Sequence, residues 1–511
     1  MVPAVLLVIL LLLVVLPLAG MFLNMDGESI RKVFAQETLG QVVQNSVTAS
    51  VLTTVISLVL AYGLAWCMER TCMPCKKLLR MLIVLPMLIP SVSIGMGAVL
   101  LGGNNGILTN LLGLQGSSIY GLSGIVWGSV MYSLPVAFVM IENILKYEDS
   151  APYEAARVLG ISKWHQFTSI TMPYLRKPMI AVVFSVFTLS FTDYGVPLMV
   201  GGKFKTLPMV MYQEVIGQLN FGKGCVYGAI LLIPAVIAFV LDQLNQNAGS
   251  TSYVNRSFDV RPKMGRDGAA LSYTAAVSLF GIAPILSFIV LAFVKKYPTN
   301  LALSLDHFMR TLERGGGEYL LNSVTIAVLT SAIGVGLCVL TAYFTARTSM
   351  KTGKYLHLIA MATGAVPGLV LGLSYVLIFK GSFLFGTVLI LVMVNIAHFF
   401  SSPYLMMYTA FSKMNENLET VATTLKISRA RLLVGVLLPK CARTIREMVS
   451  YYFVNCMMTI SAVSFLANTS NKPLALMINQ FEAQAQMEAA AVVSLLILCV
   501  NLTVKAVAER K

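Results

Sequence analysis

Apolar runs of about twenty residues recur along this chain, and they restrict it to a membrane fold, because each run can cross the roughly 30 Å hydrocarbon core of a bilayer as a helix. Only 12% of the residues are charged, against about 25% in soluble domains. The pattern predicts an all-α, polytopic membrane protein with about twelve spans, at 2–23, 42–66, 79–101, 119–143, 178–200, 223–243, 271–294, 319–345, 356–379, 384–411, 447–468 and 486–507.

The positions of the basic residues predict which loops face the cytoplasm. The chain carries a net charge of +15, with 37 Lys and Arg against 22 Asp and Glu. If both termini lie inside, about 26 of these basic residues fall in or beside loops on one side, which is the positive-inside distribution. We therefore expect cytoplasmic termini and basic loops that face anionic membrane lipid, and no nucleic-acid partner.

The second half of the chain repeats the first. Residues 45–53 and 322–330 agree at seven of nine positions, at an offset of 277. Two copies in the same direction imply a pseudo-twofold axis along the membrane normal. The predicted division is a first transmembrane domain at 1–243, a polar cytoplasmic linker at 244–270 and a second transmembrane domain at 271–511. Further matches at the same offset are Arg70-Thr71 with Arg347-Thr348, Pro90 with Pro367, and Gly95 with Gly372.

A polar, basic island at 146–177 separates two of the apolar runs, and its pattern predicts a helix, a glycine turn and a second helix. Ser150 can N-cap the first helix, and Ser162 can N-cap the second. Gly160 stands where a left-handed residue would end the first helix. Pro173 is expected to stop the second helix.

This island resembles the cytoplasmic coupling loop of bacterial ABC-importer permeases, in which Glu-Ala-Ala, three further residues, Gly and nine further residues precede Ile-x-Leu-Pro. Met172 replaces the Leu, a change that conserves volume. In that family the loop docks on the ATP-hydrolysing subunit. The resemblance therefore implies two six-helix permease repeats of the type I importer class. The matching positions are Glu154, Ala155, Ala156, Gly160, Ile170 and Pro173.

A second, less regular copy of this loop follows at 412–446, at an offset of 266. Thr420 stands in place of the Glu, Lys426 replaces the turn glycine, and Glu419 lies one position early. A non-glycine residue in a left-handed turn costs about 1 kcal/mol, so this turn is expected to differ in geometry. Either the two loops dock unequally on two ATPase subunits, or the copy has drifted without consequence. The coupling positions of this copy are Thr420, Ala422, Lys426 and Pro439.

Polar residues within the predicted spans mark a candidate path for the solute. Asp193 is the strongest candidate, because an ionisable residue inside a membrane is costly. Gly195 and Pro197 should break this span, and broken helices are tolerated where they line a cavity. The alternative is that Asp193 only satisfies the broken helix end. Ala462 is its expected equivalent in the second repeat. The candidate path residues are Thr188, Thr192, Asp193, Tyr194, Asn455, Thr459 and Ser461.

The resemblance implies a transport permease with no catalytic residues, metal or cofactor of its own. The sequence holds no Gly-x4-Gly-Lys-Ser/Thr loop, so ATP and Mg²⁺ are expected in a partner ATPase homodimer. An extracytoplasmic binding protein would deliver the solute to outward loops such as Gly201–Thr206. Cys67, Cys72 and Cys75 have no His nearby, and a structural zinc site wants four ligands, so ordinary reduced thiols are expected.

The resemblance places the chain in the bacterial cytoplasmic membrane and narrows its cargo. The stretch from Phe191 to Asp242 looks most like the 2-aminoethylphosphonate permeases, then the iron(III) type, with the polyamine type in the same group. An ion-coupled secondary carrier with an internal repeat is the alternative class. Such a carrier would need more intramembrane carboxylates than Asp193 and would not need two coupling loops.

Overall fold

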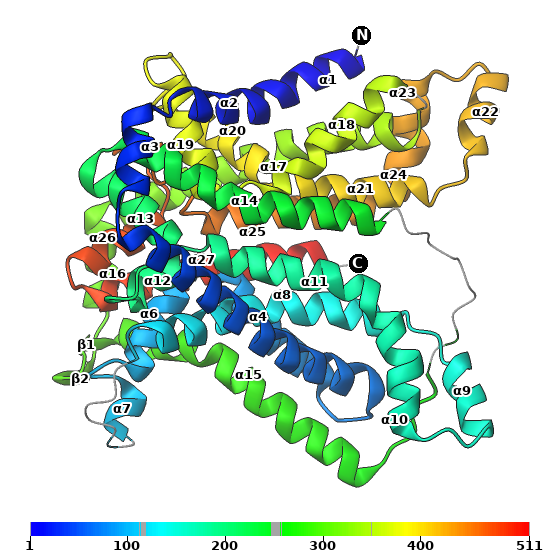
Figure 1. The fold of residues 1–511 in the computed structure, drawn as a ribbon, viewed down its shortest axis with the longest axis horizontal. Coiled ribbons are helices and arrows are strands. Elements are labelled where there is room, and N and C mark those ends of the chain that lie inside the picture. The colour runs from blue at the N-terminus through cyan, green and yellow to red at the C-terminus, as the bar shows by residue number, and fades with distance from the viewer. Residues whose placement is uncertain are drawn as a thin grey trace. The chain divides into compact units, whose positions relative to one another are not determined.

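The computed structural model describes residues 2–111, 113, 119–246, 256, 258–348 and 350–509 (Figure 1). The chain forms two compact units, and each collects segments from both halves. We call Gln36–Val210 with Pro234–Ser304 the N unit, and Met1–Ala35, Met211–Ile233 and Leu305–Lys511 the C unit. Part of the expected linker, 247–255 and 257, lies outside the described residues.

The N unit is a bundle of long helices followed by the one hairpin among the described residues. In this hairpin Val294 pairs with Leu303 and Lys296 with Asn300 in an antiparallel register. The elements are α4 (Thr38–Arg70), α5 (Lys76–Val84), η2 (Leu85–Leu88), α6 (Ser91–Gly102), α7 (Ile107–Leu111), α8 (Leu122–Lys146), α9 (Ala151–Val158), α10 (Lys163–Gln166), η3 (Phe167–Thr171), α11 (Met172–Thr192), α12 (Gly195–Val200), α15 (Met264–Phe293), β1 (Val294–Lys296) and β2 (Asn300–Leu303).

The regular elements in the described part of the C unit are all helices. Helix α13 (Leu207–Tyr212) continues into η4 (Gln213–Gly217) at the border between the units, and α14 (Phe221–Gln246) crosses that border at Pro234. The other elements are α1 (Val2–Leu10), η1 (Leu11–Val15), α2 (Leu16–Leu23), α3 (Gly27–Phe34), α16 (Asp306–Thr311), η5 (Leu312–Gly316), α17 (Gly317–Ala346), α18 (Lys351–Ala362), η6 (Thr363–Ala365), α19 (Gly368–Phe379), α20 (Val388–Phe399), α21 (Ser401–Ser412), α22 (Asn417–Thr424), α23 (Arg429–Leu432), η7 (Leu433–Leu437), α24 (Leu438–Lys440), α25 (Ala442–Met458), α26 (Leu476–Ala483) and α27 (Met487–Glu509).

By length and composition, nine described helices can cross a membrane, and eleven spans result if two bent helix pairs each count as one. The expected span 447–468 has no counterpart among them, because α25 has 17 residues and ends at Met458. The bent pairs are Lys351–Ala365 with Gly368–Phe379, at 112°, and Val388–Phe399 with Ser401–Ser412, at 55°. The expected polytopic all-α fold is thus present, with several spans interrupted.

Helix α4 shows why these sequences pack as they do. One face carries Val51, Val55 and Val59 at a spacing of four residues, and all three side chains are exposed, as a lipid-facing stripe requires. The opposite face is small and buried, and it packs on α8. The Ser57 and Ser133 hydroxyls meet there at 2.8 Å, which small residues at a membrane helix contact allow.

The first helix of each repeat packs in the unit that holds most of the other repeat. In the N unit, the Tyr273 hydroxyl of α15 donates to the Leu60 carbonyl at 2.9 Å. In the C unit, the Tyr375 hydroxyl donates to the carbonyl of Leu13, between α1 and α2, at 2.7 Å. The predicted linker at 244–270 therefore separates the two sequence repeats. The compact units do not follow this boundary, because the first helix of each repeat belongs to the unit that holds most of the other repeat.

Candidate coupling loops and transport path

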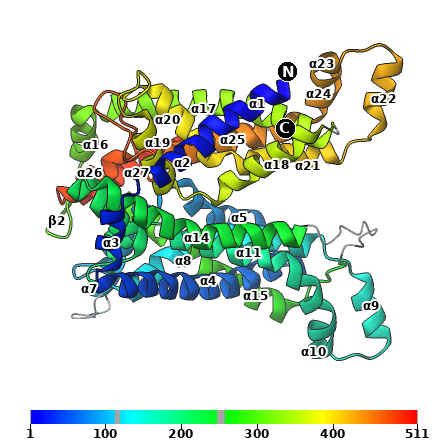
Figure 2. The ribbon, with the colours of Figure 1, turned by 45° about the horizontal axis from the view of Figure 1, so that its top comes forward.

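The first coupling loop, 146–177, projects from one end of the N unit through α9 and α10 (Figure 2). Gly160 ends α9 with φ +67°, and the Ile161 amide donates to the Ala156 carbonyl at 2.9 Å. This is the expected left-handed helix end. The Ser162 hydroxyl accepts from the His165 amide at 3.4 Å and caps α10, as expected.

Two expectations for this loop are wrong. Ser150 does not cap α9, because its hydroxyl donates to the Glu154 carboxylate at 3.0 Å, and Asp149 instead accepts from the Ala151 amide at 3.1 Å. Pro173 does not stop the helix. The π-helical turn η3 precedes it, with the Met172 amide bonded to the Phe167 carbonyl, and the helix continues into α11. A π-turn changes the local hydrogen bonding, so the missing proline N–H is accommodated.

The second coupling loop, 412–446, projects from the C unit through α22 and α23 with the same backbone design (Figure 2). Lys426 has φ +56°, close to the +67° of Gly160, and the Ile427 amide donates to the Ala422 carbonyl at 2.8 Å. Ser428 caps α23 by accepting from the Arg431 amide. The expectation of a different turn geometry is therefore wrong: Lys426 takes the left-handed conformation despite its side chain.

The exposed fractions of the motif residues show which of them pack inside the loops. Ala156 and Ala422 are 3% and 5% exposed, so these alanines pack each loop internally. Glu154 and Thr420 are exposed at equivalent positions, as are Ala155, Gly160, Lys426, Pro173 and Pro439, whereas Ile170 is half-buried. A pocket of about 480 Å³ opens beside the first turn, lined by Leu159, Gly160, Ile161, Ser162, His165, Gln166, Ser169 and Ile170.

An arginine holds the base of each loop. Arg70 donates to the Leu145 carbonyl and to Glu148, whose side chain is 5% exposed, and the Tyr153 hydroxyl also donates to Glu148. Burial raises the pKa of the Tyr153 phenol, so it remains a donor at neutral pH. These contacts join the end of α4 to the start of α9.

In the second loop the equivalent arginine, Arg347, bonds directly to a side chain on the first helix of the loop. Arg347 donates to Glu419 at 2.7 Å and to the Met414 and Asn415 carbonyls. Glu419 stands at the position equivalent to Tyr153, at the offset of 266. Glu419 thus lies one position before Thr420 because it is the ion-pair partner of Arg347.

Asp193 lies where the predicted break occurs, between α11 and α12. Its carboxylate accepts from the Gly195 amide at 3.2 Å and the Val196 amide at 3.0 Å. A carboxylate in this position satisfies the first turn of a helix. The geometry therefore gives Asp193 the capping role that was the alternative to a role in the path.

The equivalent of Asp193 in the second repeat is Thr459, and the expectation of Ala462 is wrong. Thr459 is the C-cap residue after α25, with φ −64° and ψ 123°, and Asp193 is the C-cap residue after α11, with φ −74° and ψ 129°. Ala462 instead matches Val196, since each packs on the repeated glycine, Gly372 or Gly95. Because the offset of 266 from the coupling loops continues unchanged to this point, no slip in the alignment is needed.

Three of the other candidate path residues bond to carbonyls one helical turn earlier. The Thr192 hydroxyl donates to the Thr188 carbonyl, and the Thr459 hydroxyl to the Asn455 carbonyl. Asn455 donates to the Tyr451 carbonyl. Thr188, Thr192, Asp193 and Tyr194 belong to the N unit, and Asn455, Thr459 and Ser461 to the C unit.

In each repeat a glycine packs against a serine where two segments cross, and the two residue types are exchanged between the repeats. A Cβ on Gly195 would lie 2.4 Å from the Ser91 hydroxyl oxygen, and a Cβ on Gly368 would lie 2.3 Å from that of Ser461. Ser91 is equivalent to Gly368, and Gly195 to Ser461. Each contact is therefore so close that one of its two residues must be glycine, and the glycine can belong to either of the two segments.

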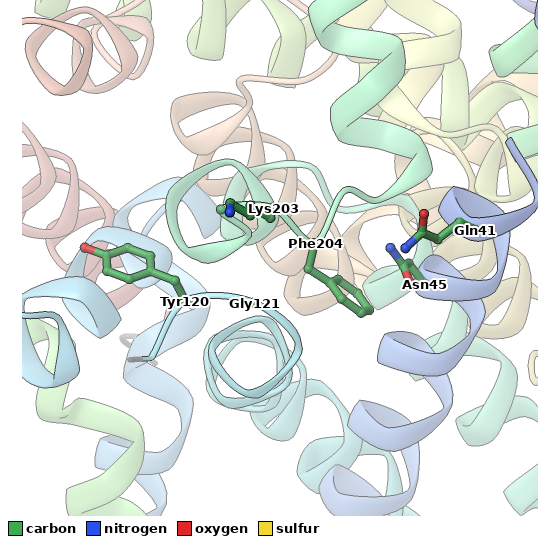
Figure 3. A pocket seen from close by; sticks show the side chains of 7 residues that line it. Gln41, Asn45, Tyr120, Gly121, Lys203 and Phe204 are labelled. Atoms are coloured by element: carbon green, nitrogen blue, oxygen red, sulfur yellow. The ribbon is translucent and has the colours of Figure 1, made fainter. Parts of the chain in front are cut away.

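A pocket of about 510 Å³ lies at the start of α4 (Figure 3). Phe204 sits between the Tyr120–Gly121 turn and the α4 residues Gln41 and Asn45. The Asn45 amide donates to the Lys205 carbonyl at 3.1 Å, and Ser46 accepts from the Leu207 amide at 2.7 Å. In the C unit the repeated Asn322 and Ser323 bond in the same way to the loop before α26, through Ser470 and Leu474.

Comparison with protein families matches the chain in two places. The family model described as binding-protein-dependent transport system inner membrane component matches residues 74–248 and 317–510, which together are well over half of the chain. The chain belongs to this family of importer permeases.

The relatives of this permease are named for the transport of different solutes. The ferric transport system permease protein FbpB of Actinobacillus pleuropneumoniae is 25% identical over 90% of this chain and 70% of its own length. The thiamine transport system permease protein ThiP of Salmonella typhimurium is 25% identical over 71% of this chain and 68% of its own. The molybdenum transport system permease protein ModB of Azotobacter vinelandii is 28% identical over 37% of this chain.

Sequence reasoning missed the residues that hold the loops of this permease in place. Arg70 and Arg347 were visible only as a repeated Arg-Thr pair, and Asn45 and Ser46 only as part of the repeated stretch. Their hydrogen-bond partners, such as Glu148 and Lys205, lie 78 and 160 residues away. A polar residue kept in both repeats at a span end was the signal that could have found them.

Proposed function

We propose that this permease forms the translocation path of an ABC importer, with the coupling loops gripping a homodimer of separate ATPase subunits. The observation that carries the proposal is the shared design of the two loops. Each has a short helix, a left-handed residue at Gly160 or Lys426, and a serine-capped second helix. Two equivalent projections suit two equivalent partners, so ATP and Mg²⁺ would act in those partners.

The exposed side chains of the loops support docking on another protein. Val158, Leu159 and Trp164 are 88%, 75% and 70% exposed on the first loop. Leu425 and Val434 are 63% and 65% exposed on the second. Apolar and aromatic side chains gathered at a projecting loop are typical of an interface core. Loop movement driven by the ATPases would then bias the permease between inward-open and outward-open states.

The outer pocket in Figure 3 supports docking of a binding protein at the opposite end of α4 from the coupling loop. Lys203 lines it, and Lys205 follows in the same loop. Acidic side chains on a binding protein would match these lysines and accelerate the encounter. Both termini and the coupling loops would then lie in the cytoplasm, as the basic loops indicate.

Ferric iron is the cargo that the relatives favour, because the ferric permease matches along 90% of this chain. The resemblance to 2-aminoethylphosphonate permeases covers only the stretch from Phe191 to Asp242, so 2-aminoethylphosphonate is the second candidate cargo. The described residues hold no cluster of three His, Cys, Asp or Glu that could bind a metal. Selection among solutes would therefore rest mainly with the binding protein.

The test is ATP hydrolysis by the permease reconstituted with its ATPase and binding protein. Ferric iron and 2-aminoethylphosphonate are each added to the binding protein, with thiamine as a third arm. We expect ferric iron to stimulate hydrolysis and uptake at least fivefold, and the other two solutes to leave both near the basal rate. Stimulation by 2-aminoethylphosphonate alone would replace iron as cargo, and failure to recruit any ATPase would refute the importer role.

A further inference from the structure

The segment that enters the second repeat contacts the first coupling loop on its way. The Arg256 amide donates to Asp149 at 3.1 Å, and the Arg256 carbonyl accepts from the Ser150 amide at 3.0 Å. The first bond ends on the Asp149 side chain and the second is backbone to backbone, and together they join the segment to the start of α9. The two amides that Asp149 binds, those of Ala151 and Arg256, lower the pKa of its carboxyl.

Phe258 extends this contact to the arginine at the loop base. The Arg70 guanidinium carbon lies 3.6 Å from the centre of the Phe258 ring, a close cation–π contact. The Tyr153 ring lies 5.2 Å from the Phe258 ring, centre to centre. One aromatic side chain thus touches the residue that ends α4 and a residue on α9.

The same segment is fastened to the start of α15. The Cys72 thiol donates to the Val260 carbonyl at 3.1 Å. Asp267, in the first turn of α15, accepts from the amides of Lys263 and Cys72 at 2.9 and 3.2 Å. Residues 256 and 258–263 therefore run from α9 to α15 with contacts at both ends.

We propose that residues 256 and 258–263 form a strap that positions the first coupling loop and passes its movement to α15. Arg256 and Phe258 are positioning residues in this scheme. In the second loop, the described contacts of Arg347 are Glu419 and backbone carbonyls of the loop itself. The two loops thus share a backbone design, and the strap ties the first of them to the opening helix of the other repeat.

The proposal rests on the importer function, so the test uses the full permease bound to its ATPase. Hydrogen exchange is measured in the first turn of α15, 264–267, with and without a non-hydrolysable ATP analogue. We expect the analogue to change exchange there at least threefold in the natural protein. Phe258→Ala should abolish that change and lower solute uptake per ATP hydrolysed at least fivefold, while ATPase binding stays intact.

Matched variants separate positioning from general damage. Phe258→Tyr keeps the aromatic ring and should restore both measurements. Asp259→Ala removes an exposed neighbour in the same strap and should leave both unchanged. Arg256→Pro deletes the amide that Asp149 accepts from and should repeat the Phe258→Ala result, whereas Arg256→Ala keeps the amide and should not.

Two results would overturn the strap. One is a normal nucleotide response at 264–267 in both Phe258→Ala and Arg256→Pro. The other is unchanged uptake per ATP in these variants. If the natural permease recruits no ATPase, the importer function itself fails, and that outcome is distinguishable because it appears before any variant is compared.

Discussion

The guanidinium of Arg347 binds the carboxylate of Glu419 at the base of the second coupling loop, as Arg70 binds Glu148 at the base of the first. Because Glu419 stands on α22, Arg347 holds that helix directly. In the first loop the equivalent place belongs to Tyr153, which reaches Arg70 through Glu148. The two repeats thus keep the connection between span and loop while the residues that make it differ.

Removing this connection should destabilise each loop. Arg347 is 3% and Glu419 24% exposed, so we expect Arg347→Ala to cost about 1–3 kcal/mol, less than a fully buried pair. The double variant with Glu419→Ala should cost less than the sum of the single changes, because no charge is left unpaired. Thermal unfolding of the purified permease measures both.

The exposed pair Arg443 and Glu447 is the control for that measurement. Their side chains are 86% and 54% exposed and one helical turn apart, so Arg443→Ala should change stability by less than about 0.5 kcal/mol. An equal loss from Arg443→Ala and Arg347→Ala would contradict a special role for the buried guanidinium.

The two left-handed turns make opposite predictions for glycine. Lys426→Gly should stabilise the second loop by about 1 kcal/mol, because Lys pays a steric cost at φ +56°. Gly160→Val should destabilise the first turn by at least that amount and should uncouple ATP hydrolysis from uptake while the protein still inserts. Unfolding and reconstituted uptake measure the two effects, and wild-type uptake by Gly160→Val would contradict the second.

Placing a lysine at the equivalent positions 154 and 420 tests whether the two coupling loops contribute equally to uptake. Glu154 is exposed on the first loop, and Thr420 occupies its place on the second. We expect Glu154→Lys to lower uptake at least tenfold at normal membrane abundance, and Thr420→Lys to lower it by less than about threefold, which are about 1.4 and 0.6 kcal/mol. A larger effect at Thr420 would reverse the proposed asymmetry.

Asp193 allows its capping role to be separated from a charged role in the path. The Gly195 and Val196 amides bind different oxygens of Asp193, and Asp193→Asn keeps one of these two acceptors, so uptake should stay within about twofold of wild type. Asp193→Ala removes the cap and should cost about 1 kcal/mol of stability. If Asp193→Asn abolished uptake at normal stability, the negative charge would be needed for transport.

The Asp149 contact of the strap should be insensitive to pH in the physiological range. Hydrogen bonds hold the folded pKa of Asp149 below its ordinary value of 3.8, so its stabilising contribution is complete above that value and is lost as the pH falls through the folded pKa. Exchange at the Ser150 amide, corrected for its intrinsic rate, should therefore be constant between about pH 5 and 8. Faster corrected exchange at pH 5 would contradict this assignment.

The sequence was most reliable where the cause of a structure is local. Gly160 and Ser162 appear in the turn and cap that their residue types favour. It was least reliable where a distant group competes. Ser150 can cap a helix, but Asp149 takes that place, and Glu419 looked displaced until Arg347 was seen beside it. Pro173 does not end the helix, because the π-helical turn η3 before it accommodates the missing proline N–H.

Residue order by itself determined the class of molecule. Apolar runs, one-sided basic loops and the Glu154 to Pro173 pattern depend only on neighbours along the chain, and they indicated a repeated permease with coupling loops. Tertiary structure alone decided that Thr459 is the equivalent of Asp193 and that Arg256, within the expected linker, contacts the first loop. The reason is physical: these relationships join groups more than 100 residues apart, and no local pattern records which distant partner satisfies a buried charge or an open amide.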